Sequence, residues 1–203
     1  MIAEASDQSL VARSRDGDTG AFRELFERKH RHIFLIVYQV LGNAADSEDV
    51  VQEVFLTLWQ RCADYDDRFP LDAWLRRIAT NRAIDHWRSR QVQRAHRFEA
   101  SPGTDPDVLL EAASGTTSGA PGRGDPEVEL GWQQLQAIWD ELAGDLPPQQ
   151  RAAFVLRHIE GIPTAEVAEA LECSASTVRS HIAEARRALR ASLRARYPEL
   201  LSG

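Results

Sequence analysis

The chain has 203 residues, 43% of them hydrophobic and 27% charged, which is ordinary for a soluble globular protein of one or two domains. Its net charge of −7 argues, taken alone, against a nucleic-acid-binding protein. The two cysteines, Cys62 and Cys173, have no CxxC partner, which excludes a disulfide scaffold or a cysteine-based zinc site. The longest uninterrupted apolar run has six residues and the N-terminus lacks the pattern of a secretory signal. We therefore expect a cytoplasmic protein that does not insert into a membrane.

The charges are distributed unevenly along the chain. Residues 71–98 and residues 175–197 each carry a net charge of +5, whereas residues 99–130 carry −6. Two basic segments on an acidic chain predict two separate surfaces that face anions.

The first half of the chain predicts three helices. Apolar residues at helical spacing run from residue 22 to 41, with Asp18 placed to cap the N-terminus and Gly42 placed to end the helix. A second apolar stripe follows and predicts a helix capped by Asp46 or Ser47.

The third predicted helix follows a loop over residues 64–70, and Pro70 suits its first turn. Its apolar side begins at Leu71 and continues to Trp87. The opposite side carries polar residues spaced four, four and three positions apart, which places them on one face. These residues are Arg77, Asn81, Asp85 and Arg88.

Residues 100–126 interrupt the helical pattern. Fifteen of these 27 residues are Gly, Pro, Ser or Thr and none is aromatic, so this segment is predicted to be a flexible linker. Because no alternating strand pattern occurs anywhere, the sequence predicts an all-α fold with two small helical domains joined by the linker. After the linker, helices are predicted over residues 128–142, from Pro147-Pro148 to Gly161, over residues 164–171, and from Ala175 onward.

The last two predicted helices and the turn between them, residues 172–174, have the layout of a helix-turn-helix. In such units the second helix enters the DNA major groove, where residues near its N-terminus reach base edges and later basic residues contact phosphates. On the pattern alone, a helical hairpin with a solvated arginine face stays open as the alternative. The candidate residues for base contacts are Ser176, Thr177, Arg179, Ser180 and His181, and those for phosphate contacts are Arg186, Arg187 and Arg190.

Two long stretches, DSEDVVQEVF at residues 46–55 and WLRRIATNRAID at residues 74–85, are specific enough to indicate a family. They resemble the sigma factors of bacterial RNA polymerase, in particular the small two-domain extracytoplasmic-function (ECF) group. Shorter matches in the same order as in the family are GDTGAF at residues 17–22, LPPQQR at 146–151, EVA at 166–168 and TVRS at 177–180.

The resemblance implies three parts of the chain with different roles. Residues 1–98 would form sigma region 2, which docks on core polymerase and recognises and melts the −10 promoter element. Residues 99–126 would be the flexible acidic linker, which is long for the group. Residues 127–203 would form sigma region 4, whose helix-turn-helix recognises the −35 element.

The resemblance also implies partners and binding residues in the first half. The partners would be promoter DNA and core RNA polymerase, through the clamp helices of its largest subunit and the flap of its second-largest. Asn81 would help to hold an unstacked base of the −10 element, and Tyr65 lies on the loop that forms the base pocket. Arg77, Arg82 and Arg88 would lie along the phosphates. The stretch that docks on the clamp helices contains Asp49, Gln52 and Glu53.

Several residues of the second half depart from the family pattern, and one of them, Pro163, occupies the place of a frequent serine N-cap. Glu172 stands where the family usually has Gly in the turn, so the turn is expected to be strained or shaped differently. Ser176 replaces another common Gly. Glu184 stands where a basic residue is usual, which argues against a phosphate contact there.

The sequence offers no catalytic or cofactor site. None of the six histidines has a carboxylate or cysteine partner at ligand spacing on one face, so we expect neither a metal site nor an enzyme. The competing function is a stand-alone helix-turn-helix transcriptional regulator, against which the polymerase-docking stretch and the helix containing Asn81 both argue. The resemblance adds an anti-sigma factor as a further candidate partner.

Overall fold

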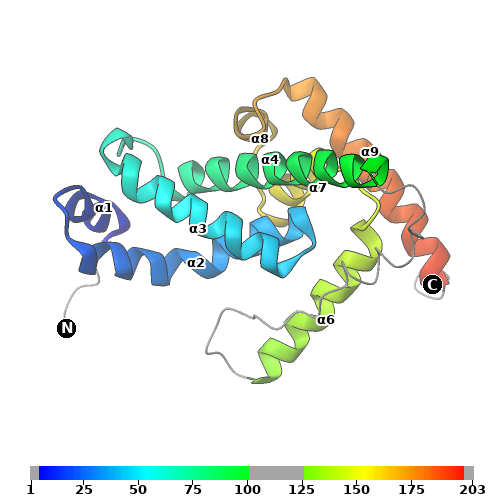
Figure 1. The fold of residues 1–203 in the computed structure, drawn as a ribbon, viewed down its shortest axis with the longest axis horizontal. Coiled ribbons are helices and arrows are strands. Elements are labelled where there is room, and N and C mark those ends of the chain that lie inside the picture. Colours follow the sequence, from blue (N-terminus) through cyan, green and yellow to red (C-terminus); the bar gives the residue numbers. More distant parts are fainter. Residues whose placement is uncertain (1–4, 101–125, 199–203) are drawn as a thin grey trace.

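The computed structural model describes residues 5–100 and 126–198, and every regular element within them is helical (Figure 1). This confirms the predicted all-α fold. The first group of helices comprises α1 (Asp7–Arg15), α2 (Thr19–Leu41), α3 (Ala44–Arg61), a 3₁₀ turn (Cys62–Asp64) and α4 (Leu71–Ala100). The second group comprises α6 (Pro126–Ala143), α7 (Pro148–Phe154), a π-helical turn (Val155–Ile159), α8 (Thr164–Ala170) and α9 (Ala175–Arg196).

The boundaries of α2 follow from its capping residues. The Asp18 side chain accepts a hydrogen bond from the Ala21 amide (3.0 Å), and Gly42 ends the helix in a left-handed conformation with φ of 69°, as predicted. Such a φ disfavours any residue with a Cβ, so glycine suits this position.

The predicted cap of α3 is wrong. Asn43 caps this helix, because its side chain accepts a hydrogen bond from the Asp46 amide (2.9 Å). Asp46 and Ser47 both lie inside the helix, which begins at Ala44, and the Ser47 hydroxyl donates to the Asn43 carbonyl (2.6 Å). Asn43 therefore both follows the end of α2 and starts the next helix.

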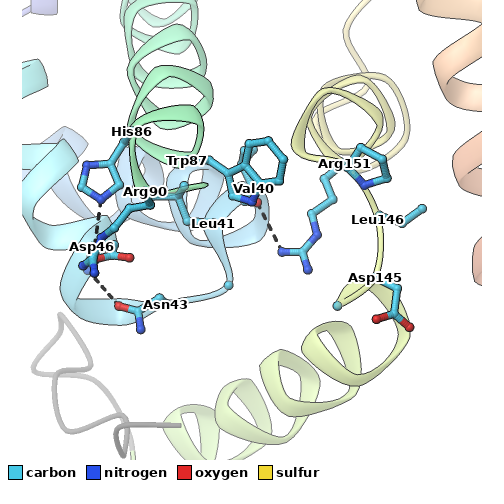
Figure 2. Close-up of a pocket in the computed structure, with 13 residues that line it drawn as sticks. Val40, Leu41, Asn43, Asp46, His86, Trp87, Arg90, Asp145, Leu146 and Arg151 are labelled. Carbon is cyan, nitrogen blue, oxygen red and sulfur yellow. Dashed lines mark hydrogen bonds and ion pairs between the residues drawn. The ribbon is translucent and has the colours of Figure 1, made fainter. Parts of the chain in front are cut away.

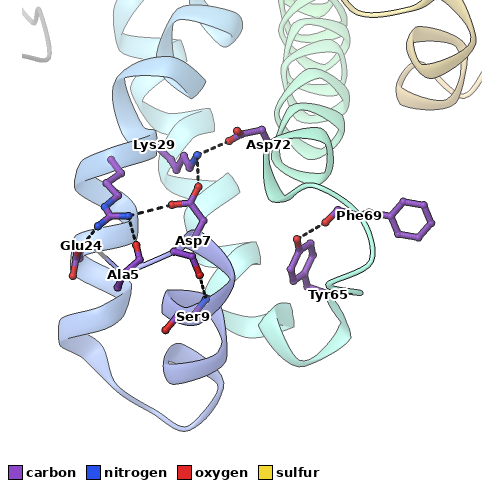
Figure 3. Close-up of polar contacts among 10 residues, drawn as sticks. Ala5, Asp7, Ser9, Glu24, Lys29, Tyr65, Phe69 and Asp72 are labelled. Atoms are coloured by element: carbon purple, nitrogen blue, oxygen red, sulfur yellow. Dashed lines mark hydrogen bonds and ion pairs between the residues drawn. The ribbon is translucent and has the colours of Figure 1, made fainter. Parts of the chain in front are cut away.

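Helix α1 was not expected from the sequence. Ser6 caps it by accepting from the Ser9 amide (3.2 Å), and Leu10 and Val11 are buried in the core of the first helix group. Lys29 of α2 ties the start of α1 to the start of α4, because its ammonium lies 2.6 Å from Asp7 and 2.8 Å from Asp72 (Figure 3).

The long helix α4 brings the two groups together. It packs against α2 and α3 on one side and contacts α7 and α8 of the second group (Figure 1). The buried cores interlock: Ala152 of α7 belongs to the cluster that surrounds Leu25 and Phe34, and Ile36 of α2 belongs to the cluster around Leu156. Fully burying a large apolar side chain stabilises a fold by about 1.5–3 kcal/mol, so this shared core holds the groups in contact.

A buried arginine lies at the interface between the first and second helix groups, which we call the seam. Arg151 of α7 is only 6% exposed; its Nε donates to the Ala143 carbonyl (2.7 Å) and its Nη1 to the Val40 carbonyl of α2 (3.2 Å) (Figure 2). A Cβ built on Gly42 would lie 3.0 Å from Nη1 of Arg151. Glycine at this position thus serves both the end of α2 and the approach of the guanidinium.

Two further hydrogen bonds cross the seam beside Arg151. The Tyr38 hydroxyl donates to Asp140 Oδ2 (2.5 Å), and Trp139 Nε1 donates to the Gln39 carbonyl (2.9 Å). Burial raises the pKa of both the Tyr38 phenol and the Asp140 carboxyl, and the positive charge of Arg151 opposes both shifts. The seam therefore combines apolar packing with hydrogen bonds between the two groups, although Asp140 Oδ1 is buried there without a hydrogen-bond partner.

The predicted linker lies almost entirely outside the described residues. Helix α4 continues to Ala100, and α6 begins at Pro126, so only the two ends of residues 99–126 fall within them. Of the helices in the described parts of the chain, none is long and apolar enough to cross a membrane.

Candidate nucleic-acid interface

The polar face of α4 has the expected residues side by side, each paired with an acidic partner. Nη2 of Arg77 lies 3.3 Å from Glu172 Oε1, and Nδ2 of Asn81 donates to the same oxygen (3.4 Å). Farther along, Arg82 pairs with Glu53 (3.6 Å) and Arg88 pairs with Asp85 (3.4 Å). The three arginines are exposed and Asn81 is half-buried.

A cavity of about 360 Å³ opens on this face. Its walls come from α3, α4 and the turn before α9, with Trp74 and Ile78 providing apolar surface beside the charged groups. A basic hollow with an aromatic wall suits an unstacked nucleotide, since phosphate oxygens need cations and a base needs an apolar face. The charged and polar lining residues are Thr57, Arg61, Arg77, Asn81, Arg82, Asp85 and Glu172.

The loop between α3 and α4 presents a different aromatic residue from the one predicted. Tyr65 is only 3% exposed, its ring packs against Trp74 at 5.8 Å between centroids, and its hydroxyl donates to the Phe69 carbonyl (Figure 3). In the free chain this ring is held inside the domain, and the part of Tyr65 in a base pocket stays a prediction. Phe69, 62% exposed, is the aromatic side chain that this loop offers to solvent. The sequence signal that could have found Phe69 is its place just before Pro70, at the tip of a polar loop.

The expected polymerase-docking residues share the outer face of α3. Asp49, Gln52 and Glu53 are all exposed, while the valines of the same helix are buried. Leu56, one turn beyond Gln52, is 58% exposed on this helix. An apolar side chain beside acidic ones is typical of a surface that another protein covers, because charges steer the encounter and apolar area contributes affinity.

The helix-turn-helix forms as predicted, with α8 and α9 joined by a short turn. Ser174 caps α9 by accepting from the Thr177 amide (3.0 Å), and its hydroxyl also contacts the hydroxyls of Ser176 (2.7 Å) and Thr177 (2.8 Å). Ser176, Arg179 and Ser180 are exposed, whereas Thr177 and His181 are half-buried. The first two turns of α9 therefore expose two hydroxyls and one guanidinium, all of which can hydrogen-bond to base edges.

A basic groove of about 720 Å³ runs along α9 from Arg179 to Arg194. Arg186, Arg187 and Arg190 line it between these ends, and all three are exposed. Arg186 and Arg187 precede Arg190 by four and three residues, so the groove has positive charge along one side of the helix, as phosphate contacts require.

Glu184 does not line the groove. Its carboxylate accepts from the Gln150 side chain of α7 (2.7 Å), so this acidic residue ties α9 to its own domain. The departure from the family pattern at this position thus has a structural role.

No group of three or more potential metal-ligating side chains occurs in the described residues. The histidines there have other surroundings: His30 lies 3.3 Å from Glu48, and His32 lies 3.3 Å from Glu160. Each pair brings a single carboxylate to one imidazole.

Both halves of the chain match known families. Residues 25–93 match the family described as Sigma-70 region 2, and residues 136–189 match the family described as Sigma-70, region 4. The two matches contain the α4 face and the helix-turn-helix, respectively.

Relatives extend over nearly the whole chain. The RNA polymerase sigma-H factor of Pseudomonas aeruginosa is 30% identical over 190 residues, which covers 93% of this chain and 94% of that protein. The ECF RNA polymerase sigma-E factor of Escherichia coli is also 30% identical over 190 residues, covering 93% of this chain and 95% of that protein.

Solved structures have the same fold. CnrH in complex with the cytosolic domain of CnrY is 25% identical, with a TM-score of 0.60 over 94% of this chain and 98% of that one. The sigma factor RpoE of Bartonella quintana, in complex with the anti-sigma factor NepR, has a TM-score of 0.60 at 21% identity over 85% of this chain and 96% of that one.

Proposed function

This chain belongs to the ECF RNA polymerase sigma factors and directs promoter-specific transcription initiation, and we propose that α4 reads and opens the −10 element while α9 reads the −35 element. The observation that carries this division is the pair of separate basic surfaces. One is a hollow with an aromatic wall on α4, and the other is a groove along a helix-turn-helix. The hollow suits an unstacked base, and the groove suits duplex DNA.

We assign the roles of the three segments accordingly. Residues 1–98 dock on core polymerase and hold the opened −10 strand, residues 99–126 link the domains, and residues 127–203 bind the −35 duplex. The surface of this chain that docks on core polymerase is the exposed face of α3, and it meets the clamp helices of the largest subunit. Region 4 meets the flap of the second-largest subunit. The residues of the α3 face are Asp49, Gln52, Glu53 and Leu56.

Sigma factors are non-catalytic DNA-recognition proteins, and we propose that this one has no enzymatic activity of its own and works in the cytoplasm with RNA polymerase. An anti-sigma factor is a further proposed partner, supported by the complex in which the Bartonella relative was solved. A stand-alone regulator is not favoured, since the chain contains both sigma regions.

The direct test is transcription in vitro from fragmented genomic DNA, with the purified chain added to core polymerase and the RNA 5′ ends mapped. We expect new start sites that share one −35 and one −10 sequence, and none of them when the chain is omitted. Start sites with no common upstream elements would contradict the assignment of two DNA-reading surfaces.

Phe69 gives a prediction about the loop before α4. Phe69→Ala should leave the free energy of unfolding unchanged within about 0.5 kcal/mol, because the side chain is exposed. It should lower promoter opening by the holoenzyme roughly fivefold, since stacking of one base on an aromatic ring contributes about 1–3 kcal/mol. Opening is followed by permanganate reactivity of unpaired thymines. If permanganate reactivity with Phe69→Ala equals that with the wild-type protein, Phe69 does not belong to the base-binding surface.

A comparison of alanine variants at Arg179 and Arg190 distinguishes contacts to bases from contacts to phosphates. Both line the basic groove, but Arg179 lies in the second turn of α9 and Arg190 about three turns farther on. We expect Arg179→Ala to cost roughly tenfold in the preference of the holoenzyme for its −35 sequence over a scrambled one. Arg190→Ala should weaken both duplexes alike and reduce the slope of affinity against salt by about one unit at most. An equal loss for both duplexes in Arg179→Ala would mean that this residue does not read bases.

A further inference from the structure

We propose that Glu172 is an acidic plug: in the free protein its carboxylate covers the −10-reading surface by occupying the place of a nucleic-acid oxygen beside Asn81 and Arg77. The proposal rests on the assignment of these two residues to −10 DNA. It adds that the turn of the helix-turn-helix masks the other DNA-reading surface of the same chain.

The Glu172 carboxylate presents one oxygen atom to the hydrogen-bond donors of both Asn81 and Arg77. One atom, Oε1 of Glu172, lies 3.4 Å from the Asn81 amide nitrogen and 3.3 Å from the Arg77 guanidinium. A base carbonyl or a phosphate oxygen bound at this point would use the same two donors. The carboxylate and the nucleic acid therefore cannot hold these donors at the same time.

The surrounding charges favour an anion at this place. Apart from Glu172, the cavity is lined by three arginines and one acidic residue, Asp85, so its wall is net positive without the plug. Glu172 comes from the second helix group, and among the described residues its carboxylate forms its hydrogen bonds and ion pair with α4 and none within its own group. Its side chain thus acts only across the interface.

The backbone at Glu172 is strained in a way that glycine would relieve. With φ of 51°, it is the only residue other than glycine with positive φ among those described. A left-handed conformation costs a residue with a Cβ free energy that glycine does not pay. The turn itself needs no side chain here, and the side chain that is present reaches α4.

The plug does not itself hold the domains together. The side chains of Glu172 and Arg77 are 66% and 53% exposed, and an ion pair this accessible to water contributes little to stability. Instead, Leu171 positions the turn, because it packs against the buried clusters of both helix groups. Whatever separates the groups, such as docking of each on core polymerase, would withdraw Glu172 and leave Asn81 and Arg77 free for DNA.

The test measures binding of the full-length chain, without polymerase, to a fluorescein-labelled pool of short single-stranded DNA by fluorescence anisotropy. Glu172→Gln keeps the size of the side chain and removes its charge, and Glu172→Gly removes the side chain. Glu169→Gln, an exposed position on α8 three residues earlier, is the matched control for loss of one negative charge. We expect Glu172→Gln to bind roughly two- to fivefold more tightly than wild type at low salt, and Glu169→Gln to gain less than about half of that.

The gain in DNA affinity must depend on Arg77 and Asn81, the two residues that Glu172 covers. In an Arg77→Ala Asn81→Ala background, Glu172→Gln should add no more affinity than Glu169→Gln does. Equal affinities of Glu172→Gln and the control in the otherwise wild-type chain would overturn the plug, as would a gain that persists in the double-alanine background. If the plug fails in this way while Asn81→Ala still impairs promoter opening by the holoenzyme, the −10 assignment stands without it.

Discussion

Replacing Arg151 with methionine is expected to lower the free energy of unfolding by roughly 3 kcal/mol. Hydrogen bonds to charged groups contribute about 1.5–3 kcal/mol each, and a buried carbonyl that loses its donor is costly. Methionine fills much of the same space but donates nothing to the Ala143 and Val40 carbonyls, which Arg151 now satisfies. It also removes the positive charge that opposes the raised pKa of the buried Asp140 carboxyl. Chemical denaturation followed by circular dichroism measures the effect.

Arg187→Ala provides the control for loss of an arginine. This residue is exposed on α9, so its removal should change the free energy of unfolding by less than about 0.5 kcal/mol. Arg151→Lys should recover only part of the loss, because an ammonium on a shorter stem does not reproduce the two-sided reach of the guanidinium. An Arg151→Met protein as stable as wild type would show that the seam does not depend on this residue.

The sequence was sufficient for most of the helices because their signals are local. The left-handed Gly42 and the Asp18 cap mark the ends of α2 by themselves, and the Ser174 cap marks the start of α9 in the same way. Helix α1 was missed because its buried side has only two apolar residues, Leu10 and Val11, too few for a periodic pattern. The cap of α3 was misplaced because three neighbouring residues, Asn43, Asp46 and Ser47, can all cap a helix, and only the backbone conformation distinguishes them.

The candidate site was predictable in its residues but not in its contacts. The spacing of Arg77 and Asn81 places them on one face of a helix, and the structure has them there. The burial of Tyr65 depends on Trp74, packed against it across a loop, and the pairing with Glu172 joins residues more than ninety positions apart. Periodicity within one helix carries no information about either contact, because both arise from how separate elements pack.

The same distinction applies to the acidic residues that pair with Arg77 and Arg82 of α4. In the sequence, Glu53 belongs to a docking face and Glu172 to a turn, with no sign that either meets α4. In the structure, Glu53 pairs with Arg82 at 3.6 Å and Glu172 pairs with Arg77 at 3.3 Å. Core polymerase bound at the α3 face would compete for Glu53, so docking on the enzyme and exposure of the basic face are physically linked.

Asn81→Ala is expected to slow promoter opening by the holoenzyme roughly thirtyfold, because loss of a good base contact costs about 1–3 kcal/mol. Folding and binding to core polymerase should stay unchanged, since Asn81 is half-buried at the surface and its side chain hydrogen-bonds only to Glu172 among the described residues. Permanganate reactivity of thymines in the −10 region, on a promoter whose start site has been mapped, reports opening directly.

Ser89→Ala is the matched control, because Ser89 is exposed on the same helix but lies outside the basic hollow. It should open the promoter at the wild-type rate. The measurement is made with saturating core polymerase, so that any effect of Asn81→Ala on the contact with Glu172 in the free chain does not enter. If Asn81→Ala and Ser89→Ala give the same reactivity as wild type, Asn81 holds no base. The unstacked nucleotide must then be held by other groups on α4 or on the loop before it, where the exposed arginines of α4 and Phe69 of the loop are available.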